Sequence, residues 1–167
     1  GYSSQNEIFT IKTINYKPLN KITVKDAYPL NNIQNLFVLL TSAIFFSKFD
    51  LFSGYYQMKL HEKSRQYTAF ITEWGLFEYN VLPMGISNAP GDFQREIKNK
   101  LGDLLQHNFI AYFLDDLLVY SKTMEEHLVH LKMFIEKMKI GLLMVKPSKC
   151  ELFKRSIKFL GHIIMDG

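Results

Sequence analysis

The chain has 167 residues, of which 47% are hydrophobic and 22% are charged, with a formal net charge of +4. This composition is typical of one globular domain and excludes a mainly disordered chain. The single cysteine excludes an internal disulfide, and the positive charge weakly favours an anionic partner such as nucleic acid. We find no secretory signal and no apolar run long enough for a membrane helix, so we expect an intracellular protein without membrane contact. Because it begins with Gly1, we expect a piece of a longer polypeptide.

Strand and helix patterns follow one another in the N-terminal part. Alternation over residues 8–14 predicts a strand, and two prolines predict that residues 17–29 are an irregular, basic stretch. Residues 31–44 predict a helix that is capped by Asn31 or Asn32 and apolar along one face.

The middle of the chain predicts mainly strands. Residues 45–52 form an apolar run that is typical of a buried strand, and this run carries one acidic side chain, Asp50. Three shorter strands are expected after it, the last two joined by a tight turn: 57–60, 67–72 and 76–82.

The C-terminal half predicts two helices and a hairpin. A helix is expected over 90–105, and a capping box at 123–126 begins a second, longer helix. Two apolar runs within 108–121 predict the hairpin, and further strands are expected over 150–153 and 157–164. The inner face of the second helix is expected to hold four apolar side chains: Leu128, Leu131, Ile135 and Met138. The whole pattern predicts an α+β fold, a sheet with helices on one face.

Asp115 and Asp116 separate the two apolar runs of the expected hairpin. One interpretation is a solvated turn, where aspartate is common. The other is a site for Mg²⁺, which prefers carboxylate oxygens and keeps positions free for phosphate and water. Asp50 favours the second interpretation, because it also ends an apolar strand, although alone it would fit a turn or a helix cap. Three carboxylates on neighbouring strand ends would suit two metal ions that activate a 3′-hydroxyl and neutralise a departing pyrophosphate.

Several sequence blocks follow one another in a fixed order. They are FSKFDLFSGYYQ at 46–57, VLPMGISNAP at 81–90, FLDDLLVYS at 113–121, KPSKC at 146–150 and FLGH at 159–162. In order and spacing these blocks resemble the reverse transcriptases of gypsy-type LTR retrotransposons, and the resemblance covers about residues 15–167.

This resemblance implies the fingers and palm of a right-hand polymerase, without a thumb. The palm is then expected to be a ferredoxin-like antiparallel sheet with helices on one face. Residues 1–167 would be one reverse transcriptase domain fragment, with the fingers at about 1–44 and 60–85 and the palm at 45–59 and 86–167.

The resemblance also implies roles for individual residues. Asp50, Asp115 and Asp116 would be the catalytic carboxylates and would bind two Mg²⁺ ions, for which Mn²⁺ is a substitute. Tyr55 would lie under the sugar of the incoming nucleotide and exclude a 2′-hydroxyl; otherwise it is a core tyrosine. The other nucleotide-binding residues would be Met84, Gly85 and Lys17. The primer grip would comprise Leu160, Gly161 and His162, in a segment that we expect to be a strand.

Three positions depart from the family pattern. Phe113 stands where the family usually has Tyr, Ile11 aligns with an Arg that holds the triphosphate, and Asn15 replaces an Asp. Because an apolar Ile cannot neutralise a phosphate, Lys17 or another basic residue would have to replace that Arg.

The expected function is RNA-directed DNA polymerase, the transfer of a nucleotide from a dNTP to a primer 3′ end. The expected partners are an RNA or DNA template with its primer, dNTPs and the rest of a Pol polyprotein with thumb, RNase H and integrase. The alternative is a catalytically degenerate or co-opted module that binds only nucleic acid or protein. The aspartates favour the first hypothesis. Ile11, Asn15 and the missing thumb favour the second, and we expect the isolated fragment to be weakly active or inactive.

Two other features are interpreted without a catalytic or metal-binding role. His127 and His130 are three positions apart on the predicted second helix, and without a third ligand they are interpreted as surface histidines. Cys150 is interpreted as a buried structural thiol.

Overall fold

A four-stranded antiparallel sheet, ordered β4-β5-β1-β6, lies at the centre of the computed structural model, which describes residues 14–29 and 31–165. Its strands are β1 (Phe45–Asp50), β4 (Ile110–Phe113), β5 (Asp116–Ser121) and β6 (Glu151–Lys154). Helix α4 (Ala89–Leu101) lies between β1 and β4 in the chain, and α5 (Met124–Ile140) lies between β5 and β6. The resulting β-α-β-β-α-β order is the predicted ferredoxin-like arrangement.

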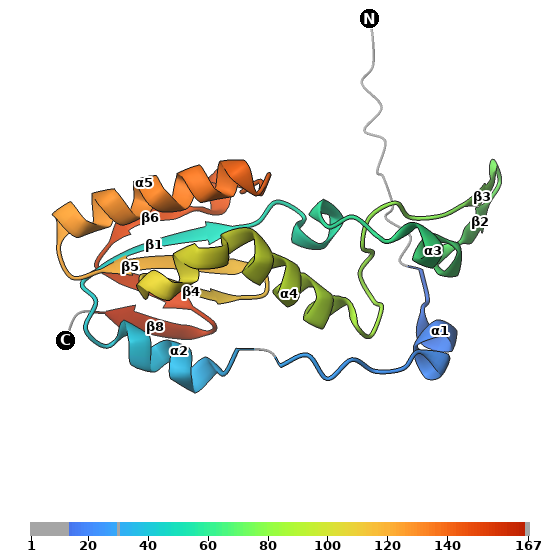
Figure 1. The fold of residues 1–167 in the computed structure, drawn as a ribbon, viewed down its shortest axis with the longest axis horizontal. Helices are drawn as coiled ribbons and strands as arrows, with labels where there is room; N and C mark the ends of the chain where they lie inside the picture. The colour runs from blue at the N-terminus through green and yellow to red at the C-terminus, as the bar shows by residue number, and fades with distance from the viewer. Residues whose placement is uncertain (1–13, 30, 166–167) are drawn as a thin grey trace, which may run out of the picture.

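Helices α4 and α5 cover one face of this sheet (Figure 1). The apolar side chains between them form the larger core, and its fully buried members include Phe93, Ile97, Leu101, Leu117 and Phe134. The capping box predicted for α5 is present, because Thr123 and Glu126 bond each other's backbone amides. Helix α4 ends before the predicted residue, at the 3₁₀ helix η3 (Gly102–His107), where Gly102 adopts a φ of 54°.

The opposite face of the sheet is also covered. Helix α2 (Ile33–Leu40) and the hairpin of β7 (Ser156–Phe159) and β8 (His162–Met165) pack there around Phe46, in a second core. The prediction of helices on one face is correct for α4 and α5 but omits α2. Asn32 caps α2 as predicted, and the helix ends at Leu40. Although α2 falls in the stretch assigned to the fingers, it packs on the sheet.

The remaining elements lie toward the end of the molecule away from the sheet (Figure 1). They are α1 (Lys17–Ile22), α3 (Glu62–Arg65), η2 (Gln66–Thr68), β2 (Phe70–Thr72) and β3 (Gly75–Phe77). The 3₁₀ helices η1 (Gly54–Gln57) and η4 (Pro147–Lys149) lie nearer to the sheet, because Gly54 approaches Asp115 and Lys149 pairs with Asp50. The irregular stretch predicted for 17–29 was wrong in its first part, because Pro18 fits the first turn of a helix, where its missing N–H is not needed. The predicted strand 57–60 was also wrong, because this segment makes only a single bridge, between Lys59 and Val81.

Two C-terminal predictions need correction. Residues 157–164 form two strands rather than one, because the chain turns at Leu160 and Gly161, both with positive φ. On α5, Leu128 and Ile135 are 54% and 43% exposed, whereas His127 and Phe134 are fully buried. The buried face of α5 is therefore rotated from the predicted one, and a polar residue takes part in it. The strand predicted over 8–14 lies outside the described residues, apart from Ile14. No helix in 14–29 and 31–165 has the length and apolar character needed to span a membrane.

Candidate active site

Asp50 and Asp116 lie directly opposite each other across the β1–β5 pair. Asp50 is the last residue of β1 and Asp116 is the first of β5, so antiparallel pairing brings these two strand ends together. Asp115 precedes Asp116 in the turn from β4, and its carbonyl accepts a hydrogen bond of 3.3 Å from the Leu51 amide. The fold therefore gathers the backbone of all three predicted carboxylates at one edge of the sheet.

Each carboxylate of the cross-strand pair is bound to a lysine. The Lys48 ammonium lies 3.0 Å from Asp116 Oδ1, and Lys149 Nζ lies 3.3 Å from Asp50 Oδ2. Lys48 is 19% exposed and Lys149 is 56% exposed, so the first pair is the better shielded from solvent. These lysines were missed in the sequence analysis, although both stand inside the blocks that carry the resemblance.

The side chains of the described residues do not gather three potential ligands around one point, since no group of three His, Cys, Asp or Glu residues is arranged to hold a metal ion. The donor chemistry nevertheless fits Mg²⁺, which typically binds one or two carboxylates and completes its shell with water and substrate phosphates. Asp50 and Asp116 offer two such carboxylates at one sheet edge. A cation at this place would compete with the Lys48 and Lys149 ammonium groups.

Two residues of neighbouring elements support the turn that carries Asp115. The buried Gln94 of α4 accepts a 3.0 Å hydrogen bond from the Leu114 amide, and Leu114 has a φ of 51°. Gly54 packs closely against the same turn, because a Cβ there would lie 3.0 Å from Phe93 Cζ and 3.4 Å from Asp115 Cβ, and Phe93 would have to shift to admit it. Gly54 belongs to the block at 46–57 and Gln94 to the helix expected over 90–105, but spacing alone did not indicate that they support this turn.

Tyr55 lies near Asp115. Its half-buried ring stacks on Phe93 with centroids 4.8 Å apart. Burial raises the pKa of the Tyr55 hydroxyl, and the negative charge of Asp115 raises it further. The phenol therefore stays neutral at physiological pH and presents an aromatic ring near Asp115.

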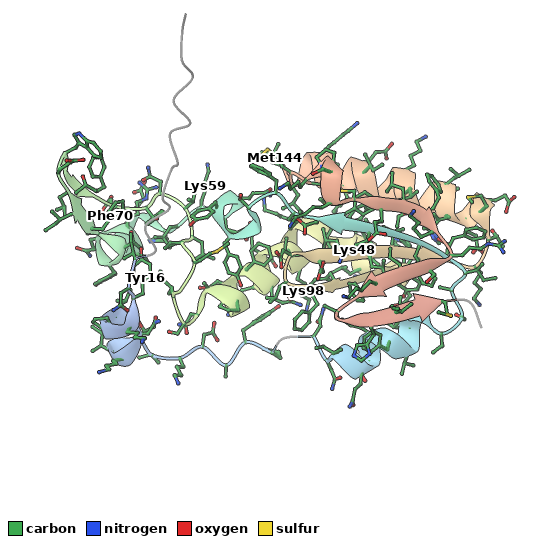
Figure 2. The ribbon with its side chains drawn as sticks, turned by 180° about the vertical axis from the view of Figure 1, so that it is seen from behind. Tyr16, Lys48, Lys59, Phe70, Lys98 and Met144 are labelled. Atoms are coloured by element: carbon green, nitrogen blue, oxygen red, sulfur yellow. The ribbon has the colours of Figure 1, made fainter. Side chains whose placement is uncertain are left out.

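The other predicted nucleotide-binding residues lie farther along the molecule. Met84 and Gly85 are exposed in the loop between β3 and α4, and the Gly85 carbonyl accepts a 2.8 Å hydrogen bond from Asn20 of α1. Lys17 is exposed at the start of α1, and Figure 1 shows α1 at the end of the molecule away from the sheet. Figure 2 likewise shows Tyr16, beside Lys17 in sequence, far from Lys48. The structure thus does not bring Lys17 together with the carboxylates.

The predicted primer grip is the turn of the β7–β8 hairpin. Leu160 is half-buried, Gly161 is exposed, and the exposed His162 ring packs edge-on against Phe37 of α2, with centroids 4.9 Å apart. The hairpin contacts the carboxylates through Lys48, whose ammonium lies 3.5 Å from the Lys158 carbonyl of β7. The hairpin and the carboxylate pair therefore lie on the same face of the sheet.

Four other residues singled out in the sequence analysis had different outcomes. The prediction that His127 is a surface residue was wrong, because this side chain is fully buried. Cys150 is half-buried and packs against the larger core, and its thiol contacts the Lys146 carbonyl at 3.4 Å. Phe113 is half-buried at the edge of the second core. Ile11 lies outside the described residues.

Known proteins resemble this chain over nearly all of it. Residues 8–164 match the family model described as reverse transcriptase (RNA-dependent DNA polymerase). The enzymatic polyprotein of cauliflower mosaic virus (strain Strasbourg) is 39% identical over 154 residues, which cover 92% of this chain and 22% of that protein. The retrovirus-related Pol polyprotein from transposon 297 of Drosophila melanogaster is 37% identical over 151 residues, 90% of this chain and 14% of that protein.

Solved structures resemble the fold. The foamy viral protease-reverse transcriptase in complex with an RNA/DNA hybrid superimposes with a TM-score of 0.80 at 23% identity, over 92% of this chain and 20% of that one. The chain therefore spans about a fifth, or less, of the length of these relatives.

Proposed function

Because the chain belongs to the reverse transcriptase (RNA-dependent DNA polymerase) family, we propose that it is the fingers and palm portion of an RNA-directed DNA polymerase within a longer Pol polyprotein. The observation that carries this proposal is the cross-strand pairing of Asp50 with Asp116, next to Asp115 at the β4–β5 turn. Acidic side chains at one sheet edge are the donor set that nucleotidyl transfer requires.

The proposed reaction joins a dNTP to a primer. The 3′ oxygen of the primer attacks the α-phosphorus and loses its proton to solvent, the bond to the bridging oxygen of the β-phosphate breaks, and pyrophosphate leaves. Asp50, Asp115 and Asp116 would hold Mg²⁺, or Mn²⁺ in its place, which supplies positive charge to the reacting oxygens when bound. Lys48 and Lys149 neutralise two of these carboxylates in the protein alone and would release them when the cation and the triphosphate bind.

Neighbouring residues would place the substrates. The Tyr55 ring, stacked on Phe93, would lie under the deoxyribose and exclude a 2′-hydroxyl by its volume. Met84 and Gly85 would contact the nucleotide from the exposed loop before α4.

The β7–β8 turn would hold the primer end through Leu160, Gly161 and His162. The template would be RNA or DNA paired with this primer. The remaining parts of the polymerase and its processing enzymes, namely the thumb, RNase H and integrase, would come from the rest of the polyprotein.

Single-nucleotide incorporation tests this proposal. The chain is mixed in excess with a primed RNA template, one dNTP and Mg²⁺ or Mn²⁺, so that weak duplex binding does not hide the chemical step. We expect Asp50→Asn and Asp116→Asn each to lower the rate by roughly a hundredfold or more, as loss of a catalytic electrostatic group does. Asp103→Asn is the matched control, because Asp103 is exposed and binds Lys137 outside the site. Equal rates for Asp50→Asn and Asp103→Asn would contradict the proposal.

The pairing of Asp50 and Asp116 with lysines supports a second candidate, a polymerase-like module that binds nucleic acid or protein without catalysis. Under this candidate the unmodified chain incorporates no nucleotide, while its affinity for a primed template is unchanged in the variant carrying both Asp50→Asn and Asp116→Asn. Single-nucleotide incorporation by the unmodified chain distinguishes the two candidates, and a fluorescence-anisotropy titration with the labelled duplex measures the affinity.

A further inference from the structure

A cluster of buried polar side chains lies between α5 and the sheet, outside the carboxylate site. Ser47 of β1 and His127 of α5 are fully buried, and Ser121 at the end of β5 is 4% exposed. The Ser47 hydroxyl lies 2.8 Å from His127 Nε2, and the Ser121 hydroxyl lies 2.9 Å from His127 Nδ1. One imidazole therefore bridges the two strands that carry Asp50 and Asp116.

A third strand, β6, joins the cluster at a β-bulge. The register between β1 and β6 shifts between Phe46 and Lys48, and Phe153 of β6 adopts a φ of 54°. Its amide donates a 3.1 Å hydrogen bond to the Ser47 hydroxyl instead of to a strand carbonyl. The Ser47 side chain thus satisfies a backbone donor that the bulge leaves out of the ladder.

The donors and acceptors of this cluster are all satisfied when the hydrogen bonds run in one direction, from the Phe153 amide to His130. The Phe153 N–H can only donate, so Ser47 Oγ accepts from it and donates its own hydrogen to His127 Nε2, its other contact. His127 then carries its hydrogen on Nδ1 and donates to Ser121. Ser121 donates in turn to His130 Nδ1, which lies 2.7 Å from its hydroxyl. If His127 Nε2 instead donated to Ser47, the fully buried Ser47 hydroxyl would have no acceptor for its own hydrogen among these contacts. Leaving a buried donor without an acceptor is costly.

Aromatic rings enclose both histidines. The His127 ring packs edge-on against Phe153 with centroids 5.8 Å apart and lies 6.3 Å from the Phe45 ring. The His130 ring stacks on Phe109, with centroids 4.1 Å apart and only 3° between the planes. The imidazoles are thereby fixed in orientation as well as in hydrogen bonding.

We propose that His127 is a positioning residue, which with Ser47, Ser121 and His130 forms a one-directional hydrogen-bond chain that fixes α5, β1, β5 and β6 in register, on the face of the sheet opposite to the candidate catalytic carboxylates. These hydrogen bonds act at a distance from the carboxylates, because Ser47 lies three positions before Asp50 and Ser121 lies five positions after Asp116. The link to the carboxylates rests on the proposed function, whereas the chain of hydrogen bonds does not.

The surroundings favour neutral rings. The titratable and charged groups that face the two histidines are Glu126 on α5, His107 on η3 and Arg155 over the Phe45 ring, and the Tyr120 backbone carbonyl on β5 faces His130. Burial, together with the smaller effect of the neighbouring His130, lowers the pKa of His127 to about 4. Burial also lowers the pKa of His130, while the Tyr120 carbonyl and Glu126 oppose this shift. Neutral histidine is the form that can both accept and donate a hydrogen bond, as the hydrogen-bond chain requires.

Histidine tautomers provide the direct test. A long-range ¹⁵N–¹H correlation spectrum of the ¹⁵N-histidine-labelled chain near pH 7 distinguishes a ring protonated on Nδ1 from one protonated on Nε2. We expect His127 as the Nδ1–H tautomer and His130 as the Nε2–H tautomer, each identified by the signal lost in its glutamine variant. His127 as the Nε2–H tautomer or as imidazolium would overturn the hydrogen-bond chain.

The positioning role is tested with Mn²⁺ as the probe, by titration followed with electron paramagnetic resonance. The His127→Gln amide retains one acceptor and one donor, so it should bind Mn²⁺ nearly as well as the unmodified chain. His127→Leu should bind Mn²⁺ roughly two- to thirtyfold more weakly, the range that coupling through packed networks gives. His107→Leu, at an exposed position, is the matched control and should leave the affinity unchanged.

The outcomes distinguish a failure of the proposed function from a failure of the positioning role of His127. Equal Mn²⁺ affinity for His127→Leu and the unmodified chain would refute the positioning role even where the tautomers are as expected. An unmodified chain that binds no Mn²⁺ would overturn both the proposed function and the positioning role, while the tautomers would still decide whether the hydrogen-bond chain exists. Where His127→Leu fails to fold, the pair Ser121→Ala and Ser121→Thr replaces it, because only threonine keeps the hydroxyl.

Discussion

Acid should destabilise this fold through His127. The folded chain holds the pKa of this side chain at about 4, against 6.5 for an ordinary histidine, because burial disfavours the charged ring. Between these two pH values the unfolded chain binds more protons than the folded chain. The stabilising contribution is therefore fully present above about pH 6.5 and is lost as the pH falls toward 4.

The size of the effect follows from the two pKa values. At about pH 5 the free energy of unfolding should fall by about 2 kcal/mol relative to pH 8, and the full loss below pH 4 is about 3 kcal/mol. For a domain of this length a loss of about 2 kcal/mol lowers the melting temperature by about 4–8 °C. Titration of His130, whose pKa is also lowered, acts in the same direction.

Urea unfolding followed by circular dichroism at about pH 8 and pH 5 measures this loss. His127→Gln is the control, because its amide keeps one donor and one acceptor but does not titrate in this range. The difference between the two proteins isolates His127 from the other histidines and from the carboxylates. If both proteins lose the same free energy between the two pH values, His127 is not held neutral by burial and the reasoning fails.

Other substitutions probe the carboxylate site. Gly54→Ala should destabilise the chain by about 1–3 kcal/mol, because its Cβ would press on Phe93 at 3.0 Å; a melting temperature equal to that of the unmodified chain would contradict this packing. Tyr55→Val should relax discrimination against ribonucleotides while Tyr55→Phe should not, as measured by the ratio of kcat/KM for matched nucleotides; a constant ratio removes Tyr55 from the sugar pocket. Lys48→Met removes the ammonium that competes with a cation at Asp116. Its Mn²⁺ affinity should rise, while the metal-free protein loses about 1 kcal/mol of stability; weaker Mn²⁺ binding would show that Lys48 assists the cation instead.

The strands and helices of the sheet were predictable because their signals are local. The aspartates between two apolar runs indicated the β4–β5 hairpin, and Thr123 with Glu126 marked the start of α5. The apolar run of β1 likewise placed Asp50 at a strand end. In each case neighbouring residues carry the whole pattern, and tertiary packing agrees with it.

Other features depend on contacts between distant residues. The buried face of α5 was predicted around Leu128 because apolar side chains normally face the core, but His127 is buried there through partners on β1 and β5. The β7–β8 turn was missed because Leu160 adopts a positive φ, which is unusual for a bulky residue. The lysine partners of the carboxylates were missed for the same reason as His127, since Lys149 lies 99 positions from Asp50.

The pairing of β1 with β5 has a consequence for the order of folding. The β4–β5 hairpin joins neighbours in the chain, whereas the Ser47–His127 contact joins residues 80 positions apart, and closing a long loop costs entropy before any contact is gained. The hairpin should therefore gain protection from hydrogen exchange before β1 does, in a pulse-labelling experiment on the refolding chain. During synthesis Asp50 leaves the ribosome long before Asp116 and Lys149 exist, so its carboxylate stays in water until the chain has been made as far as Lys149.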